Sequence, residues 1–369
     1  MVEEASYLKE AGFEVIVATQ EFEERPMLED ALASIGVRVR TLAPPAFLSD
    51  WPRRHYEFCR ALLYRPRWLH SGDFDLARVC MPWSNRGLEN IWLCNRAGIP
   101  VIVSAHNTFP GGNLQTAWHA RHLVKAFSSV KGLVALTGES LDGFNKAFGN
   151  YLSTATIQRV IPNAVDTGKF VASNEARVDL RDRLGISQET RVVGSVGRLS
   201  DHKRPVELIR VFRDVASRVS GTHMVLVGEG ELRREVEAEI DRSNLRGMVT
   251  LLGNQEQVER VVAGLDVHVL LSSIEGFASV NAEAMACEVP VVATDVPGSR
   301  AVVKDGLTGY LVSLGNNRTA ADRVVHLLTA TDVGRQMGRH GRREVLECYS
   351  VQQKKQRWLD LYRDILQLT

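Results

Sequence analysis

Cysteine, net charge and long apolar runs are all scarce in this sequence of 369 residues, and each scarcity excludes a class of protein. The five cysteines are scattered and odd in number, which argues against a disulfide framework, and none has the spacing of a metal-binding motif. The formal net charge of +1 argues against a nucleic-acid-binding surface. We find no signal peptide and no apolar run long enough to span a bilayer, so we expect a cytoplasmic protein with at most peripheral membrane contact.

The chain has the ordinary composition of a globular protein, with 44% hydrophobic and 24% charged residues, and a length that suits two domains. Short apolar runs alternate with amphipathic stretches, which is typical of parallel α/β folds. We expect a first domain over residues 1–170, a polar linker over 171–190, a second domain over 191–348 and a final helix over 349–369. Strands are predicted at 13–19, 37–42, 99–104, 133–137, 224–227, 249–253, 267–271 and 291–294, and in the run that begins at Val192.

The most informative stretch covers residues 270–295. A buried strand leads into a polar turn that contains Glu275, and a helix capped by Ser279 or Asn281 should follow until Pro290 stops it. The loop of this strand–loop–helix unit lies beyond the carboxyl ends of parallel strands, where open α/β sheets bind ligands. The helix N-terminus suits a phosphate, and carboxylates beside it would accept hydrogen bonds from sugar or ribose hydroxyls.

Three short sequence motifs follow one another in this stretch: Glu275-Gly276-Phe277, Glu283-Ala284-Met285-Ala286-Cys287 and Pro290-Val291-Val292-Ala293-Thr294. In that order they resemble the glutamate-pair signature of retaining GT-B glycosyltransferases of family 4. Glu288 stands where that family usually has glycine, and Ala278-Ser279 replaces a common glycine-containing pair. Neither departure removes a proposed ligand group.

The resemblance implies a fold and a reaction. The fold would be two Rossmann-like, doubly wound α/β domains that face each other across a cleft, with the last helix crossing back to the first domain. The reaction would move a sugar from a nucleotide diphosphate sugar to an acceptor hydroxyl with retention, in cell-surface polysaccharide or glycolipid synthesis. It implies neither a cofactor nor a metal, because protein cations would neutralise the diphosphate. The resemblance covers nearly the whole chain and is densest over residues 192–312.

The same resemblance implies roles for individual residues. Arg198 and Lys203 would clamp the diphosphate, Glu275 would hold the sugar, Glu283 the ribose, and His106 would orient the sugar or the acceptor. Further donor contacts are expected at Gly276, Phe277, Ala278 and Ser279, and the nucleotide pocket would be shaped by Gly228 and Gly253. The alternative for the two cations is a solvated surface, and for His106 it is a hydrogen-bonded core position.

One basic stretch and one acidic pair in the first domain are each open to two interpretations. Residues 51–68 interleave five arginines with aromatic and apolar side chains against a single acid, Glu57, which suits an anionic membrane surface or a lipid-phosphate acceptor. The alternative is a domain helix with its arginines in solvent. Asp73 and Asp75 resemble the metal-binding acidic pair of GT-A enzymes, but a triplet of this kind is common by chance, so we assign it no metal.

The beginning of the sequence departs from the resembled family. Residues 1–11 form an amphipathic helix before the strand at 13–19, whereas the family has a strand and a glycine-rich turn before that helix. We therefore expect either a start placed too late or a first domain without its central strand, with two exposed strand edges and low stability. The missing turn keeps open the alternative of an inactive donor-binding subunit. A sugar-nucleotide epimerase on the same fold is a further alternative.

Overall fold

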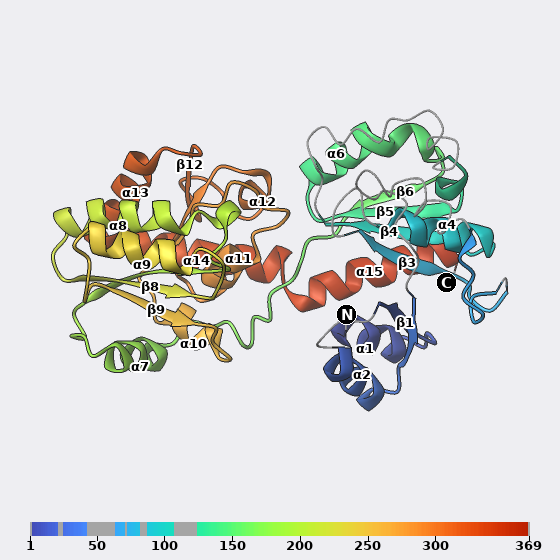
Figure 1. The fold of residues 1–369 in the computed structure, drawn as a ribbon, viewed down its shortest axis with the longest axis horizontal. Helices are drawn as coiled ribbons and strands as arrows, with labels where there is room; N and C mark the ends of the chain where they lie inside the picture. Colours follow the sequence, from blue (N-terminus) through green and yellow to red (C-terminus); the bar gives the residue numbers. More distant parts are fainter. Residues whose placement is uncertain are drawn as a thin grey trace. The chain divides into compact units, whose positions relative to one another are not determined.

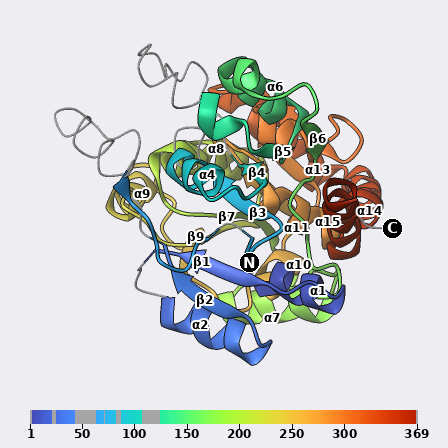
Figure 2. The ribbon, with the colours of Figure 1, turned by 90° about the vertical axis from the view of Figure 1, so that its right-hand side faces the viewer.

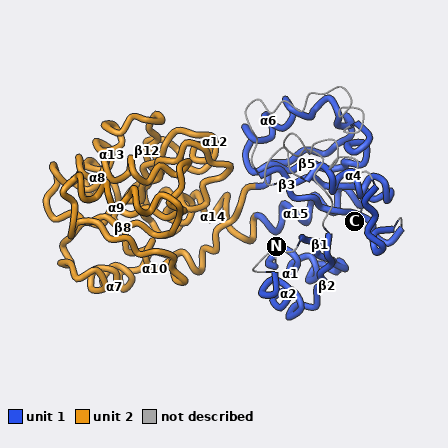
Figure 3. The backbone as a smooth tube through the Cα atoms, viewed as in Figure 1, with its two compact units in different colours: residues 1–161, 354–369 blue, residues 162–353 orange. Residues whose placement is uncertain are grey.

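The computed structural model describes residues 2–20, 25–42, 63–70, 72–81, 87–106 and 124–367. The chain divides into two compact units, and both chain ends belong to the first (Figure 3). Unit 1 consists of residues 1–161 and 354–369, and unit 2 of residues 162–353. In each unit parallel strands alternate with helices, so the predicted α/β class is confirmed (Figure 1).

Unit 2 contains one six-stranded parallel sheet in the order β12-β11-β10-β7-β8-β9. The chain starts at the central strand β7, runs outward through β8 and β9, and returns to β10 on the other side of β7. The boundary between β7 and β10 is therefore the topological switch point, where sheets of this type bind ligands. The strands are β7 (Arg191–Val196), β8 (Thr222–Val227), β9 (Val249–Gly253), β10 (Val267–Leu270), β11 (Val291–Thr294) and β12 (Gly309–Val312).

Helices cover both faces of this sheet, which explains why its strands are rich in buried valine. α8 (Pro205–Arg218), α9 (Arg233–Arg242) and α13 (Asn317–Thr329) enclose the main apolar core with alternate residues of the strands. Figure 1 shows α8 and α13 above the sheet and α7 and α10 below it. The second layer consists of α7 (Asn174–Leu184), α10 (Val258–Ala263), α11 (Ser279–Ala286) and α14 (Thr331–Cys348), and α12 (Pro297–Arg300) follows β11.

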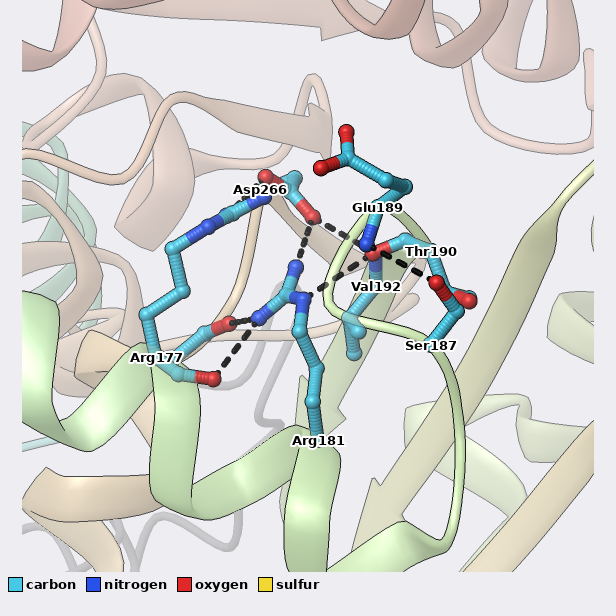
Figure 4. A network of polar contacts seen from close by, with 8 residues as sticks. Arg177, Arg181, Ser187, Glu189, Thr190, Val192 and Asp266 are labelled. Carbon is cyan, nitrogen blue, oxygen red and sulfur yellow. Dashed lines mark hydrogen bonds and ion pairs between the residues drawn. The ribbon is translucent and has the colours of Figure 1, made fainter.

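The segment 171–190, expected to be a linker, instead contributes α7 to unit 2. Arg181 of α7 is fully buried and donates to the carbonyls of Thr190, Arg177 and Gly264, each at 3.0 Å, and to Asp266 at 2.6 Å (Figure 4). Asp266 also accepts the backbone N–H of Val192 at 2.6 Å. The polar composition that suggested a linker therefore belongs to an internal ion-pair network, which fixes α7 to the start of β7 and β10. The structure places the division of the chain earlier, between residues 161 and 162.

The described strands of unit 1 form two separate parallel sheets (Figure 2). One has the order β3-β4-β5-β6 and the other pairs β1 with β2. No strand among the described residues joins them. The strands are β1 (Ile16–Thr19), β2 (Arg38–Thr41), β3 (Ala77–Met81), β4 (Val101–Ala105), β5 (Val130–Ala135) and β6 (Ile157–Val160).

Helices connect the two sheets of unit 1. α1 (Val2–Glu10) and α15 (Val351–Leu366) share an apolar cluster with β4 and β5, in which Trp358 and Tyr362 are buried. Residues of α15 from 354 onward belong to unit 1, and a Cβ at Gly132 of β5 would come within 2.7 Å of Ile365. The other helices of unit 1 whose bounds are described are α2 (Arg25–Ser34) beside β2, and α4 (Leu88–Arg96) and α6 (Gly138–Phe148) against the four-stranded sheet.

Candidate active site

The carboxyl end of β7 borders an open pocket of about 610 Å³ in unit 2. Arg198 follows β7 directly, is exposed and lines this pocket together with the turn after β8 and the loop after β9. The lining residues include Gly197, Gly228, Glu229, Asn254 and Gln255. An exposed guanidinium beside backbone N–H groups and amide side chains is suited to a phosphorylated, hydrogen-bonding ligand.

Glycines let the backbones around this pocket approach one another. Gly228 has φ +122°, and a Cβ there would lie 2.2 Å from the carbonyl oxygen of Gly197. The N–H of Gly228 donates to the carbonyl of Gly253 at 2.8 Å, so the two glycines predicted to shape the pocket lie together. A Cβ at Gly230 would lie 2.4 Å from the carbonyl oxygen of Leu199. The pocket wall therefore depends on the absence of side chains at these positions.

Lys203 and Glu275 form an ion pair across the switch point. The Nζ of Lys203 lies 2.6 Å from Oε1 of Glu275, and both side chains are largely buried. The backbone holds them together, because the N–H of Ser273 donates to the carbonyl of His202 at 2.8 Å. In this structure the predicted diphosphate cation and the predicted sugar-binding carboxylate therefore neutralise each other.

The loop before α11 is pinned by Gly298. Its N–H donates to the carbonyl of Glu275 at 3.1 Å, and its carbonyl accepts the N–H of Ala278 at 3.1 Å. A Cβ at Gly298 would lie 2.5 Å from the carbonyl oxygen of Glu275. Among the other expected donor contacts, Phe277 is buried and its ring packs edge-on against Tyr349, so that side chain belongs to the core.

The expected side-chain cap of α11 is wrong. The helix begins at Ser279 after Ala278, and no side chain caps it. Asn281 lies inside the helix with its side chain fully buried on the side of β10, so it is not available as a cap. No side chain caps the first N–H groups of α11, but those of Ser279 and Asn281 donate to the backbone carbonyls of Phe277 at 2.9 Å and Ala278 at 3.0 Å, so the turn itself satisfies part of this helix end.

Glu283 lies in the second turn of α11 and is partly buried. Burial raises the pKa of its carboxyl, and the charge of Lys169 partly opposes that effect. A carboxyl in such a position gains from a hydrogen-bonding ligand, which would replace the water that burial excludes.

His106 belongs to unit 1, at the carboxyl end of β4. Its Nε2 lies 3.2 Å from the Cys80 Sγ and 3.3 Å from the Ser104 Oγ, and its backbone N–H donates to the carbonyl of Met81 at 2.9 Å. Burial lowers the pKa of His106 to about 4, and the charges of Arg78 and Lys354 add to this effect. The imidazole is therefore neutral at physiological pH.

The structure thus gathers the predicted residues in two groups. Arg198 and Gly228 line the pocket and Gly253 is hydrogen-bonded to Gly228, while Lys203 and Glu275 meet at the switch point, all in unit 2. Glu229, Asn254 and Gln255 were not predicted, because loop side chains carry no periodic signal. Gly298 was also not predicted as a site residue.

Two further sequence predictions concern unit 1. Asp73 and Asp75 are exposed in the loop that leads into β3, as the sequence suggested. Of the basic segment 51–68, residues 51–62 lie outside the described residues. None of the described helices is both long and apolar enough to cross a membrane.

Solved structures define the fold class. The structure resembles that of HepE from Anabaena in complex with UDP, with a TM-score of 0.77 and 19% identity over 98% of this chain and 96% of that one. A glycosyltransferase from Rickettsia africae gives a TM-score of 0.78 at 16% identity, covering 100% of this chain and 94% of that one. Both units together therefore have the GT-B arrangement of two Rossmann-like domains in sequence.

Sequence comparison then gives the family. The Glycosyltransferase Family 4 profile matches residues 1–169, and the Glycosyl transferases group 1 profile matches residues 177–344. The chain belongs to glycosyltransferase family 4. The D-inositol 3-phosphate glycosyltransferase of Rhodococcus erythropolis is 26% identical over 89% of this chain and 78% of its own length. The N-acetyl-alpha-D-glucosaminyl L-malate synthase of Bacillus anthracis is 29% identical over 51% of this chain, and that match spans about half of the synthase (49%).

Proposed function

We propose that this glycosyltransferase moves a sugar from a nucleotide diphosphate sugar to an acceptor hydroxyl with retention, in the synthesis of a cell-surface polysaccharide or glycolipid. One observation carries the proposal: Arg198, Lys203 and Glu275 lie at the carboxyl ends of β7 and β10, on either side of the switch point of unit 2. Two cations and a carboxylate at this place match a diphosphate joined to a polyhydroxylated sugar.

Donor binding would replace the Lys203–Glu275 ion pair by two new interactions. The diphosphate offers Lys203 a stronger partner, and the sugar hydroxyls can donate to the released Glu275 carboxylate. Arg198 would add a second fixed cation beside the pocket. As the bond between the anomeric carbon and the phosphate oxygen breaks, negative charge grows on the diphosphate, and the two cations stabilise it. This arrangement requires no metal.

The nucleotide would occupy the pocket beyond Arg198. Its ribose would be placed near Glu283 and its base near Asn254 and Gln255, whose amides can both donate and accept. HepE has the same fold and was solved with UDP, which makes a uridine nucleotide the first donor to test. The two relatives are named for transfer or synthesis, and neither is named as an inactive subunit or an epimerase.

The decisive experiment compares UDP binding and donor turnover in the wild type and in Arg198→Ala. We expect at least about a tenfold loss in both, since a charged hydrogen bond contributes roughly 1.5–3 kcal/mol. Arg218→Ala is the matched control, because it removes an arginine of unit 2 whose partner is the surface residue Asp322. Unchanged calorimetric affinity and unchanged turnover in Arg198→Ala would refute the proposed diphosphate site.

A lipid-linked acceptor would bring the enzyme to the cytoplasmic face of a membrane through the basic segment 51–68. Replacing Arg53, Arg54 and Arg60 with glutamate should then release the protein from anionic vesicles, and added salt should weaken binding of the wild type. A wild-type protein that never sediments with such vesicles would show that the segment does not serve as an anchor.

A further inference from the structure

A line of polar side chains runs from the interior of unit 1 to His106. Nη2 of Arg78 donates to the Ser104 Oγ at 3.2 Å, and the same oxygen lies 3.3 Å from Nε2 of His106. Arg78 is held from behind, because it pairs with Glu4 of α1 and its guanidinium lies 3.9 Å from the ring centroid of Trp358. The hydrogen-bonded series therefore runs from the fixed guanidinium of Arg78 to Nε2 of His106.

The direction of the hydrogen bonds in this line follows from what each group can do. A guanidinium only donates, so Ser104 accepts from Arg78 and keeps its own O–H to donate. Ser104 is 1% exposed, and a buried hydroxyl hydrogen without an acceptor is costly. His106 Nε2 is the acceptor within reach of that oxygen. The second neighbour of Nε2 is the thiol of Cys80 at 3.2 Å; although the residue is exposed, desolvation of its thiol raises its pKa, so the sulfur stays protonated at physiological pH.

The surrounding charges oppose protonation of the ring. Arg78 and Cys80 face His106 from β3, and Lys354 faces it from α15. Burial disfavours an imidazolium most, and the cations Arg78 and Lys354 add to this effect, so a second proton does not enter at Nε2. Since Nε2 accepts, the single ring proton belongs on Nδ1.

We propose that Arg78 and Ser104 are positioning residues that fix His106 as the neutral tautomer with its proton on Nδ1. His106 then offers one N–H donor, which holds an oxygen of the transferred sugar or of the acceptor, and it does not act as a general base. The role of this N–H group in holding a substrate oxygen rests on the proposed function, whereas the assignment of the tautomer does not.

Histidine nitrogen NMR tests the tautomer without any substrate. The signal of His106 in uniformly ¹⁵N-histidine-labelled protein is assigned by its loss in His106→Asn. We expect a protonated Nδ1 and an unprotonated Nε2 from about pH 8 down to about pH 5. A protonated Nε2 in the wild type would overturn the proposal, and this reading needs no variant other than the His106→Asn protein used for the assignment.

Two variants separate positioning from simple packing. In Ser104→Ala we expect a second population with the proton on Nε2, while Cys80→Ser, which retains a donor at the neighbouring position, should keep the wild-type spectrum. A Ser104→Ala spectrum identical to that of the wild type would contradict the role of Ser104.

Transfer activity provides an independent test of the role of the Nδ1–H group. The amide of asparagine places an N–H near the position of Nδ1, and that of glutamine places one near Nε2. We therefore expect His106→Asn to retain at least about tenfold more kcat/KM than His106→Gln, and the reverse order would overturn the donor role. A wild type with the expected tautomer but no transfer from any nucleotide sugar would refute the proposed function and leave the tautomer standing.

Discussion

Unit 2 contains one six-stranded sheet enclosed by two helical layers, whereas the described strands of unit 1 form a four-stranded sheet and a separate pair. The pair β1–β2 packs with α1 and α2 around a small cluster whose buried members, among the described residues, are Ala5, Leu32 and Val37. A two-stranded sheet is marginally stable by itself, while a central strand such as β7 is paired on both sides.

This difference shows why most candidate binding residues lie in unit 2. Contacts such as Gly228 against the carbonyl of Gly197 require two strand ends to be held within a fraction of an ångström. A continuous sheet provides that rigidity. In unit 1 the carbonyl of Met81 holds the backbone of His106 at the end of β4, and side chains hold its ring, through Ser104 and Arg78.

The largest expected effect is in Arg181→Ala, which tests whether α7 is an integral part of unit 2. The variant leaves Asp266 partly buried beside Arg177 as its remaining cation, and we expect about 3–5 kcal/mol lower free energy of unfolding for unit 2. Chemical denaturation followed by a unit 2 probe measures it. Arg159→Ala is the control, because its pair with Asp364 in unit 1 is about half exposed and should contribute less than about 1 kcal/mol. Equal losses in both variants would mean that residues 171–190 behave as a linker after all.

Acid should weaken unit 2 through His268. This residue of β10 is fully buried, and burial lowers its pKa to about 4. The unfolded state takes up a proton below about pH 6.5 and the folded state does not, so stability falls as the pH drops from about 6.5 to about 4. The shift corresponds to about 3 kcal/mol at most.

The measurement is the pH dependence of unfolding in the wild type and two leucine variants. His268→Leu should reduce the acid sensitivity of unit 2, and His70→Leu, at an exposed position of unit 1, should leave it unchanged. A His268→Leu protein with the acid sensitivity of the wild type would locate the titrating group elsewhere.

The comparison of the units also shows what could be predicted from the sequence. The strands of unit 2 were predictable because they are short valine-rich runs bounded by turns. The family resemblance was predictable because the motifs that contain Glu275 and Glu283 follow one another in a fixed order. The position of α7 was not, since the buried Arg181 looks like any surface arginine until its partner Asp266, far along the chain, is in place. The hydrogen bonds from Arg78 through Ser104 to His106 could not be predicted for the same reason, because these residues come together only after β3 and β4 pair.

Hydrogen exchange should report the difference between the sheets directly. We expect the amides of β1 and β2 to exchange on the order of tenfold to a hundredfold faster than those of β7, β8 and β10, because local opening of the strand pair breaks few buried contacts. Mass spectrometry of peptides from each strand provides the rates. Equal protection in both sets would show that β1 and β2 are paired more extensively than the described residues indicate.

The smallest expected effect is that of metal removal, for which we predict no change in transfer. In unit 2, Arg198 and Lys203 supply two positive charges beside the proposed diphosphate site, so a divalent cation has little charge left to neutralise there. In unit 1, Asp73 and Asp75 lie exposed in the loop before β3, where they are free to be solvated by water. Activity should therefore persist in excess chelator, and Asp73→Asn combined with Asp75→Asn should leave the rate and donor affinity unchanged. An activity that disappears in chelator and returns with manganese would contradict the metal-independent mechanism, and its loss in the double variant would place the metal at the acidic pair of unit 1 rather than at the cations of unit 2.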